Sequence, residues 1–319
     1  MQQRLLEKGV SYFSLFNFIL LKRNGCGIII TLNKVGKREM DIKAIVFDLD
    51  RTLLTSDEII TDRTVEIMKR ARRSGAELVI CTGRSQTSAG YAIERLGGVS
   101  YIISHAGCVI TDCRTGQEVY RRSLPRQLAA EISAFADQYD EDVFVEAMSS
   151  ATSIVSEGDI VRAETLRFSE KYIDLIKRNI IIPQNLTDFI RYNDIVEIDK
   201  FFMYARTQEL ADKLYDEYSA WDGCTTLIPL PCGVELIPTG VDKGVALREL
   251  ANILGIGLEN MMVAGDSDND KHMFLPEVFK VAVDNAIPSL KELADYIAPS
   301  NDNDGVAETV RKFVLKEDV

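Results

Sequence analysis

The sequence lacks an excess of positive charge, and it lacks closely paired cysteines. It has 37 Lys and Arg against 49 Asp and Glu, a net charge of -12. This charge argues against nucleic acid as a partner, because affinity for a polyanion depends on neutralising phosphates with Lys and Arg. Its six cysteines include no C-x-x-C spacing, so neither a zinc knuckle nor a redox pair is indicated. Reduced thiols and a cytoplasmic location are the plain interpretation.

A long hydrophobic run is also missing. The stretch from Val10 to Leu21 covers about a dozen residues and is interrupted by polar ones, whereas a bilayer span needs roughly 20. We therefore predict no stable membrane span. The basic residues around the stretch leave a signal-peptide core as an alternative, although no small-x-small cleavage site clearly follows it. The favoured interpretation makes residues 1–39 an N-terminal extension, disordered or upstream of a natural start at Met40.

The 319 residues, 46% hydrophobic and 27% charged, suit a globular chain of two domains. Short apolar runs alternate with amphipathic stretches from Lys43 onward. Runs such as Lys43–Phe47 are typical of strands buried on both faces. The expected strands are 43–47, 76–81 and 101–104, with helices at 61–73 and 85–96 between them. This βαβαβ order predicts a parallel sheet covered by helices.

After Gly107 the alternation of apolar runs with amphipathic stretches is interrupted, and it resumes later in the chain. A hairpin is expected at 108–122, followed by helices at 125–139, 160–178 and 208–218 among strands at 142–146, 152–156, 196–205 and 224–228. The alternation resumes with helix 242–254, strand 260–264, helix 268–275, strand 279–283 and helices 289–294 and 304–315. The fold class is therefore α/β, a doubly wound Rossmann-like core (40–111 and 225–319) with an inserted α+β domain (112–224).

Four short motifs lie where core strands end or core helices begin. Asp48-Leu49-Asp50 ends the first strand, at the sheet edge where open α/β sheets bind ligands. Asp266 and Asp270 follow the strand at 260–264, and hard carboxylate oxygens there suit Mg²⁺. An EF-hand loop beginning at Asp266 is a rival interpretation, but Lys271 stands where that loop needs Gly.

The other two motifs suit an anion. Thr82-Gly83-Arg84 opens a helix with a hydroxyl, a flexible Gly and free amides, which together favour phosphate. Lys243 lies in the first turn of a helix, where a cation opposes the helix dipole. That position is favourable if the ammonium of Lys243 pairs with a carboxylate and a phosphate.

The motifs D-x-D-x-T, T-G-R, D-K-G and G-D-x-x-N-D occur in this order, and together they resemble the haloacid dehalogenase-like phosphatase superfamily. The long gap between Thr82 and Lys243 is similar to that of the Cof-type, class IIB group, in which an inserted cap domain stands there. The resemblance covers about Met40 to Val319 and includes the stretch 301–305 near the end.

The resemblance implies a Mg²⁺-dependent phosphatase for small phosphate monoesters such as sugar phosphates or phosphorylated cofactors and their precursors. Asp48 is then the nucleophile that forms an aspartyl-phosphate, and Asp50 is the general acid and base. Lys243 neutralises the negative charge on the phosphoryl oxygens and on Asp48. The implied phosphate-binding residues are Thr82, Gly83, Arg84 and Asn269, and the implied Mg²⁺ ligands are Asp48, Asp50 through its main chain, Asp266 and Asp270.

Three positions depart from the family pattern: Arg51 and Asp284 each stand in place of Gly, and Ala106 stands in place of Asn. None removes a catalytic group. His105 is expected to be structural and His272 to lie on the surface. A phosphomutase and a non-catalytic phosphate-ester binding protein remain as alternatives. The resemblance implies a small-molecule phosphate ester as the partner, and we expect the chain to be a monomer or homodimer.

Overall fold

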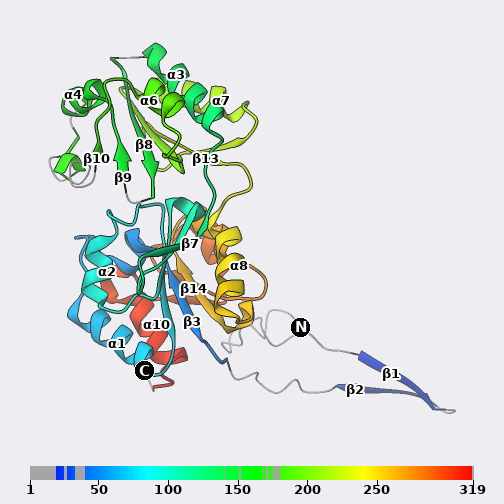
Figure 1. Cartoon of the computed structure of the whole chain (residues 1–319). Coiled ribbons are helices and arrows are strands. Elements are labelled where there is room, and N and C mark those ends of the chain that lie inside the picture. The colour runs from blue at the N-terminus through cyan, green and yellow to red at the C-terminus, as the bar shows by residue number, and fades with distance from the viewer. Residues whose placement is uncertain are drawn as a thin grey trace.

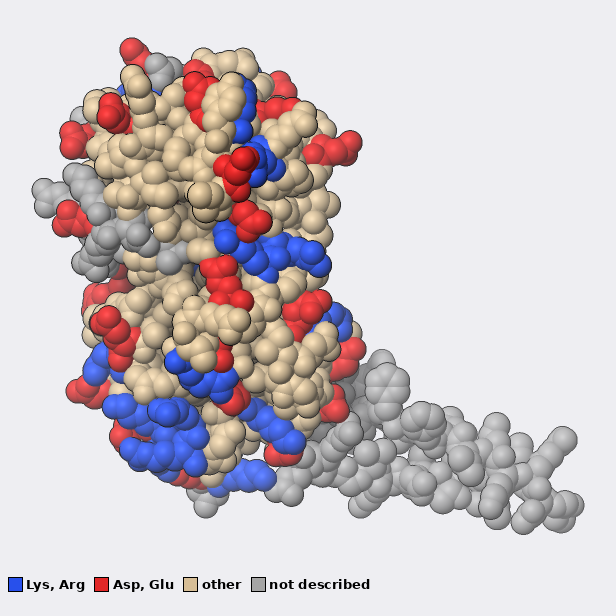
Figure 2. Space-filling model, in the orientation of Figure 1, with Lys and Arg blue, Asp and Glu red and all other residues tan. Residues whose placement is uncertain are grey.

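The computed structural model describes residues 19–24, 27–32 and 40–317, except 140, 151, 167, 170, 171 and 175–179. Most of the apolar stretch at 10–21 therefore lies outside the described residues. β1 (Ile19–Asn24) and β2 (Gly27–Leu32) pair as an antiparallel hairpin. The remaining strands form two sheets in two lobes (Figure 1), and the molecular surface narrows between the lobes (Figure 2). No described helix has both the length and the apolar character to cross a membrane.

The larger sheet is mainly parallel. Its described strands lie in the order β16 (Tyr296–Ala298), β15 (Phe279–Val283), β14 (Met261–Gly265), β3 (Ala44–Phe47), β4 (Glu77–Cys81), β5 (Tyr101–Ser104), β6 (Val109–Asp112) and β7 (Gln117–Arg121). The strands from β16 to β5 run parallel to one another. β6 pairs antiparallel with β5, and β7 pairs antiparallel with β6. β14, β3 and β4 are central, so the loops at their carboxyl ends meet.

Helices cover both faces of this sheet because its central strands are apolar on both sides. Ile45 and Phe47 point to the face covered by α1 (Asp62–Arg73), α2 (Gly90–Leu96), α9 (Pro288–Lys291) and α10 (Gly305–Phe313). Ala44 and Val46 point to the opposite face, which α8 (Lys243–Leu254) covers. The predicted doubly wound, Rossmann-like core is confirmed.

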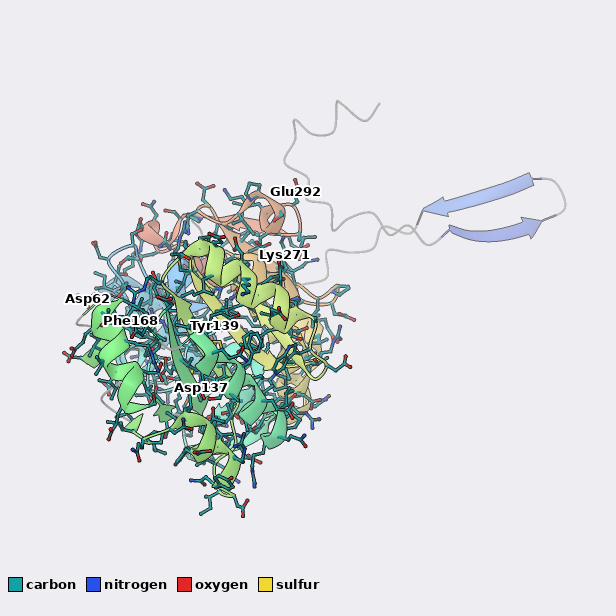
Figure 3. All side chains as sticks on the ribbon, turned by 90° about the horizontal axis from the view of Figure 1, so that it is seen from above. Asp62, Asp137, Tyr139, Phe168, Lys271 and Glu292 are labelled. Atoms are coloured by element: carbon teal, nitrogen blue, oxygen red, sulfur yellow. The ribbon has the colours of Figure 1, made fainter. Side chains whose placement is uncertain are left out.

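The smaller sheet has the order β10 (Ile180–Ile181), β9 (Thr152–Ile154), β8 (Val143–Ser149), β11 (Lys200–Ala205), β13 (Gly233–Pro238) and β12 (Cys224–Leu227). One face packs on α3 (Arg126–Ala136), α6 (Leu186–Tyr192) and α7 (Gln208–Ser219). The other face packs on α4 (Glu157–Thr165) and an aromatic cluster. Tyr139 and Phe168, labelled in Figure 3, belong to these two opposite faces.

Strand pairing bears on the position of both predicted domain boundaries. The larger sheet continues to Arg121, because β7 pairs with β6. The smaller sheet continues to Pro238, because β13 pairs with β11. We therefore propose to draw the boundaries after Arg121 and Pro238 instead of at 112 and 224. Strand pairing is not a local property, and β13 was not predicted at all.

Several helix limits also differ from expectation. The helix predicted from Ser85 begins at Gly90, because Ser85 accepts a hydrogen bond from the amide of Ser88 in a preceding turn. The helix predicted from residue 160 begins at Glu157, where Ser156 caps it, and ends at Thr165. The stretch after Ser267 forms the 3₁₀-helix η8 (Asp268–Met273).

Candidate active site

Three neighbouring strand ends bring the predicted motifs together. Asp48 directly follows β3, and its amide donates to the carbonyl oxygen of Ala264 in β14 at 3.1 Å. Asp266 follows β14, and Thr82 follows β4 on the other side of β3. Parallel strands place their carboxyl ends at one edge, which is why these side chains meet there.

Lys243 lies between two carboxylates. Its ammonium donates to Oδ1 of Asp48 and to Oδ1 of Asp270, each at 2.7 Å. All three side chains are buried, with Lys243 only 1% exposed. Burial alone lowers the pKa of Lys243, but the carboxylates of Asp270 and Asp48 outweigh burial and raise that pKa well above its usual value. The two carboxylates therefore favour the charged form of the ammonium.

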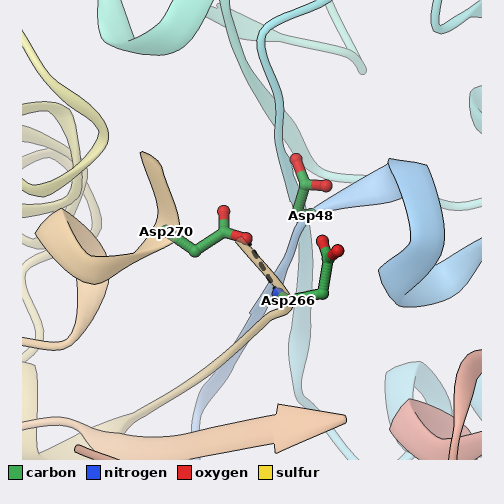
Figure 4. Close-up of side chains that lie close together, drawn as sticks. All are labelled: Asp48, Asp266 and Asp270. Atoms are coloured by element: carbon green, nitrogen blue, oxygen red, sulfur yellow. Dashed lines mark hydrogen bonds between the residues drawn. The ribbon is translucent and has the colours of Figure 1, made fainter. Parts of the chain in front are cut away.

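Asp48, Asp266 and Asp270 form a compact acidic trio. One carboxylate oxygen from each lies within 4.8 Å of the others, and the three side chains converge in Figure 4. The Oδ2 atom of Asp270 accepts from the amides of Asp266 at 2.9 Å and Ser267 at 3.0 Å. Asp266 accepts from the hydroxyl of Thr52 at 3.0 Å. These hydrogen bonds hold the trio in place.

The trio carries more negative charge than Lys243 balances. Burial raises the pKa of Asp48 to about 7 against the lowering effect of Lys243. Burial, followed by the charge of Asp270, raises the pKa of Asp266 to about 6. When all three carboxylates are ionised, they and the one ammonium leave two negative charges, which a divalent cation would neutralise. The oxygen-only donor set is the kind that Mg²⁺ prefers, so the trio could hold such an ion.

The Thr82-Gly83-Arg84 motif lies beside Asp50. Thr82 is fully buried, and its hydroxyl oxygen accepts from the amide of Arg84 at 3.2 Å. The guanidinium of Arg84 donates twice to the carboxylate of Asp50, with 2.9 Å between Nε and Oδ2. The side chain of Asp50 therefore pairs with Arg84 and is not part of the trio.

The remaining predicted residues lie at the surface of the site or away from it. Asn269 is exposed, and its Oδ1 atom accepts from the hydroxyl of Ser267 at 2.9 Å. Asp268 is exposed and pairs with Lys271, and a strand rather than a helix precedes this loop. The EF-hand alternative is therefore wrong. His272 is exposed, as predicted, and His105 is fully buried.

Two departures from the family pattern occupy left-handed backbone positions. Arg51 and Ala106 each have φ of 57°, where Gly and Asn are favoured and other residues are strained. The side-chain amide of Asn285, next to the third departure, Asp284, donates to the carbonyl oxygen of Arg51 at 2.7 Å and helps to hold that turn.

Sequence reasoning missed two residues of the site. Thr52 was seen only as part of a motif, yet its hydroxyl orients Asp266. Lys200 comes from β11 of the smaller sheet, and its ammonium donates to the carbonyl oxygen of Gly83 at 2.9 Å. The D-x-D-x-T pattern already contains Thr52, whereas no local signal marks Lys200.

Comparisons with known proteins indicate the family of the chain. The sequence model of the haloacid dehalogenase-like hydrolases matches residues 45–310. A phosphatase of Bacillus subtilis is 28% identical over 289 residues, which cover 86% of this chain and 100% of that protein. A 5-amino-6-(5-phospho-D-ribitylamino)uracil phosphatase of the same organism is 27% identical over 281 residues, which cover 88% of this chain and 99% of that protein.

Solved structures show the same fold. A haloacid dehalogenase-like hydrolase from Bacteroides thetaiotaomicron superposes with a TM-score of 0.72 at 24% identity, covering 85% of this chain and 99% of that one. A subclass IIB sugar phosphatase superposes with a TM-score of 0.68 at 20% identity, covering 85% and 98%. This chain belongs to the haloacid dehalogenase-like hydrolases, as an enzyme of their phosphatase class. The predicted resemblance is confirmed.

Proposed function

We propose that the protein is a Mg²⁺-dependent phosphatase that hydrolyses small phosphate monoesters through a phosphate bound covalently to Asp48. The observation that carries this proposal is the placement of Asp48, buried at a strand end and bonded to Lys243 within an acidic trio. The substrate class is a sugar phosphate or a phosphorylated cofactor or precursor. The names of the ribitylaminouracil phosphatase and the sugar phosphatase support that class.

In the first step an oxygen of Asp48 attacks phosphorus, and the bond between phosphorus and the ester oxygen breaks. Asp50, once it has taken up a proton from solvent, gives that proton to the departing alkoxide. Thr82, Gly83, Arg84 and Asn269 contact the phosphoryl oxygens. Lys243 keeps its positive charge beside Asp48 throughout, and so stabilises the charge that develops there.

In the second step Asp50 takes a proton from water, whose oxygen attacks the same phosphorus. The bond to Asp48 breaks, and inorganic phosphate leaves. Asp48, Asp266, the main chain of Asp50 and, directly or through water, Asp270 would hold Mg²⁺, which supplies positive charge to the phosphoryl oxygens when bound. A cytoplasmic location and a monomeric or homodimeric state stay predictions.

The test measures phosphate release from a broad panel of phosphate esters by the wild type, Asp48→Asn and Asp268→Asn, with Mg²⁺ and with EDTA. Asp268 supplies a matched control because the same isosteric change there affects an exposed carboxylate. We expect release by the wild type and Asp268→Asn that EDTA abolishes, and none by Asp48→Asn. No release from any ester by folded, magnesium-loaded wild type would refute the proposal.

A further inference from the structure

All three carbonyl groups of the Thr82-Gly83-Arg84 loop are held by hydrogen bonds. The amide of Ala106 donates to the oxygen of Thr82 at 3.1 Å, and the amide of His105 donates to that of Arg84 at 3.0 Å. Both donors belong to the core domain. The donor to the middle carbonyl, that of Gly83, is instead the ammonium of Lys200 at 2.9 Å, from β11 of the inserted domain.

The side chain of Lys200 is itself held in place by a partner in the inserted domain. Only 2% of Lys200 is exposed, and burying an ammonium is costly unless it is paired. Its partner within the inserted domain is the carboxylate of Glu235 on β13. Phe202 lies opposite Glu235 in the register, so Lys200 and Glu235 share one face of that sheet as a diagonal pair. The ammonium thus joins this sheet to the core loop.

Asp199, the residue before Lys200, also forms hydrogen bonds with the segment that connects the domains. The carboxylate of Asp199 accepts from Nε of Arg121 and from the hydroxyl of Ser123, each at 2.8 Å. Arg121 ends the larger sheet, and His105 Nδ1 lies 3.6 Å from the same carboxylate. Two consecutive residues therefore fix the start of β11 relative to the core.

The hydrogen bond from Lys200 to the carbonyl oxygen of Gly83 affects the position of more than one group in the loop. This carbonyl and the amide of Arg84 belong to one planar peptide group, and that amide donates to the Thr82 hydroxyl oxygen. A side chain at Gly83 would meet nothing within 4 Å, so no packing restrains this peptide from that side. Holding the carbonyl therefore holds the hydroxyl of Thr82 and the start of the Arg84 side chain.

We propose that Lys200 is a positioning residue for the phosphate-binding loop, through which the inserted domain completes the phosphate site. This inference rests on the proposed function of the same loop. Because Lys200 acts on the loop and not on the leaving group, its removal weakens the binding of every phosphate ester by the same factor. A residue that contacted the leaving group would instead discriminate among esters.

The experiment compares the wild type with Lys200→Met, Lys200→Arg and the double variant Lys200→Met/Glu235→Gln. Binding of inorganic phosphate in the presence of Mg²⁺ is measured by calorimetry, and KM and kcat are measured for phosphate esters with small and large leaving groups. The double variant removes the unpaired charge that Lys200→Met leaves on the partly buried Glu235, so it separates the lost loop contact from a folding defect. Lys213→Met, on the exposed side of α7, is the matched control.

We expect Lys200→Met and the double variant to weaken phosphate binding roughly 10-fold, the effect of one lost charge-assisted hydrogen bond, and to raise KM equally for all esters. Lys200→Arg should recover part of the binding, and Lys213→Met should match the wild type. Unchanged phosphate binding in the folded double variant, or a rise in KM confined to large leaving groups, overturns the proposal. Absence of turnover by the wild type would instead count against the proposed function, because phosphate binding is measured separately.

Discussion

The ammonium of Lys243 lies 2.7 Å from the carboxylate of Asp48, although the two residues are 195 positions apart in the sequence. The same ammonium reaches Asp270 at 2.7 Å. One buried cation thus connects the first strand of the core, the helix α8 that follows the inserted domain, and η8. Changes at this contact should affect stability and catalysis together.

Replacing Lys243 with Met should leave Asp48 and Asp270 as uncompensated buried charges. We expect a loss of roughly 3 kcal/mol in the free energy of unfolding and a fall in kcat of roughly 100-fold or more. Urea unfolding and phosphate release measure the two effects. Lys43→Met, which removes an exposed lysine, is the control and should change the stability by less than about 1 kcal/mol. A stable and active Lys243→Met protein would contradict the assigned charge balance.

Changing Arg84 to Lys should disturb the orientation of Asp50, because Lys cannot reproduce the two-pronged hydrogen bonding of a guanidinium. We expect kcat to fall roughly 10-fold for an alkyl phosphate. The fall should be smaller for p-nitrophenyl phosphate, whose leaving group does not need a proton. Arg73→Lys, at an exposed position, serves as the control. An equal rise in KM for both esters would show that Arg84 acts on the phosphate alone.

The effect of Mg²⁺ on stability should depend on pH. The folded protein holds the pKa of Asp48 at about 7 and that of Asp266 at about 6, both above their ordinary values because of burial. A raised carboxyl pKa contributes stability at low pH, and this contribution is lost as the pH rises through the folded pKa. The metal-free protein should therefore lose stability from these groups between about pH 4 and 7.

Mg²⁺ binds the ionised carboxylates, so the rise in Tm that it causes should be larger at pH 8 than at pH 5. Thermal unfolding with and without magnesium chloride at several pH values measures this difference. Asp266→Asn should reduce the rise in Tm at pH 8. The same rise in Tm at both pH values would show that these carboxyls do not govern cation binding.

Gly244 allows α8 to lie close to η8. A Cβ atom at this position would be 2.1 Å from the carbonyl oxygen of His272, a backbone atom that cannot rotate away. We expect Gly244→Ala to cost roughly 2 kcal/mol of unfolding free energy and to lower activity by moving Asp270 away from Lys243. Gly90→Ala has nothing within 4 Å of the added atom and should be neutral or slightly stabilising. Denaturant unfolding of both variants tests this contrast.

Local patterns in the sequence were sufficient for the alternating core and its motifs. The strand β3 and the helix α1, capped by Thr61, follow from apolar periodicity and capping chemistry, which involve only near neighbours. Because a parallel sheet places the carboxyl ends of its strands at one edge, the convergence of Asp48, Thr82 and Asp266 was also predictable. Each of these inferences depends on a short stretch of chain and one general rule.

Other contacts between distant groups were decided only by the tertiary structure. The pairing of β13 with β11, on which the proposed boundary at Pro238 rests, was not predictable, since strand pairing depends on the whole sheet. The contact between Lys200 and Gly83 joins residues 117 positions apart in two different domains. The sequence by itself determined most of the core strands and helices and the motifs at their ends. The folded structure determined how the inserted domain is placed on the core, because that placement depends on contacts between surfaces that no local pattern encodes.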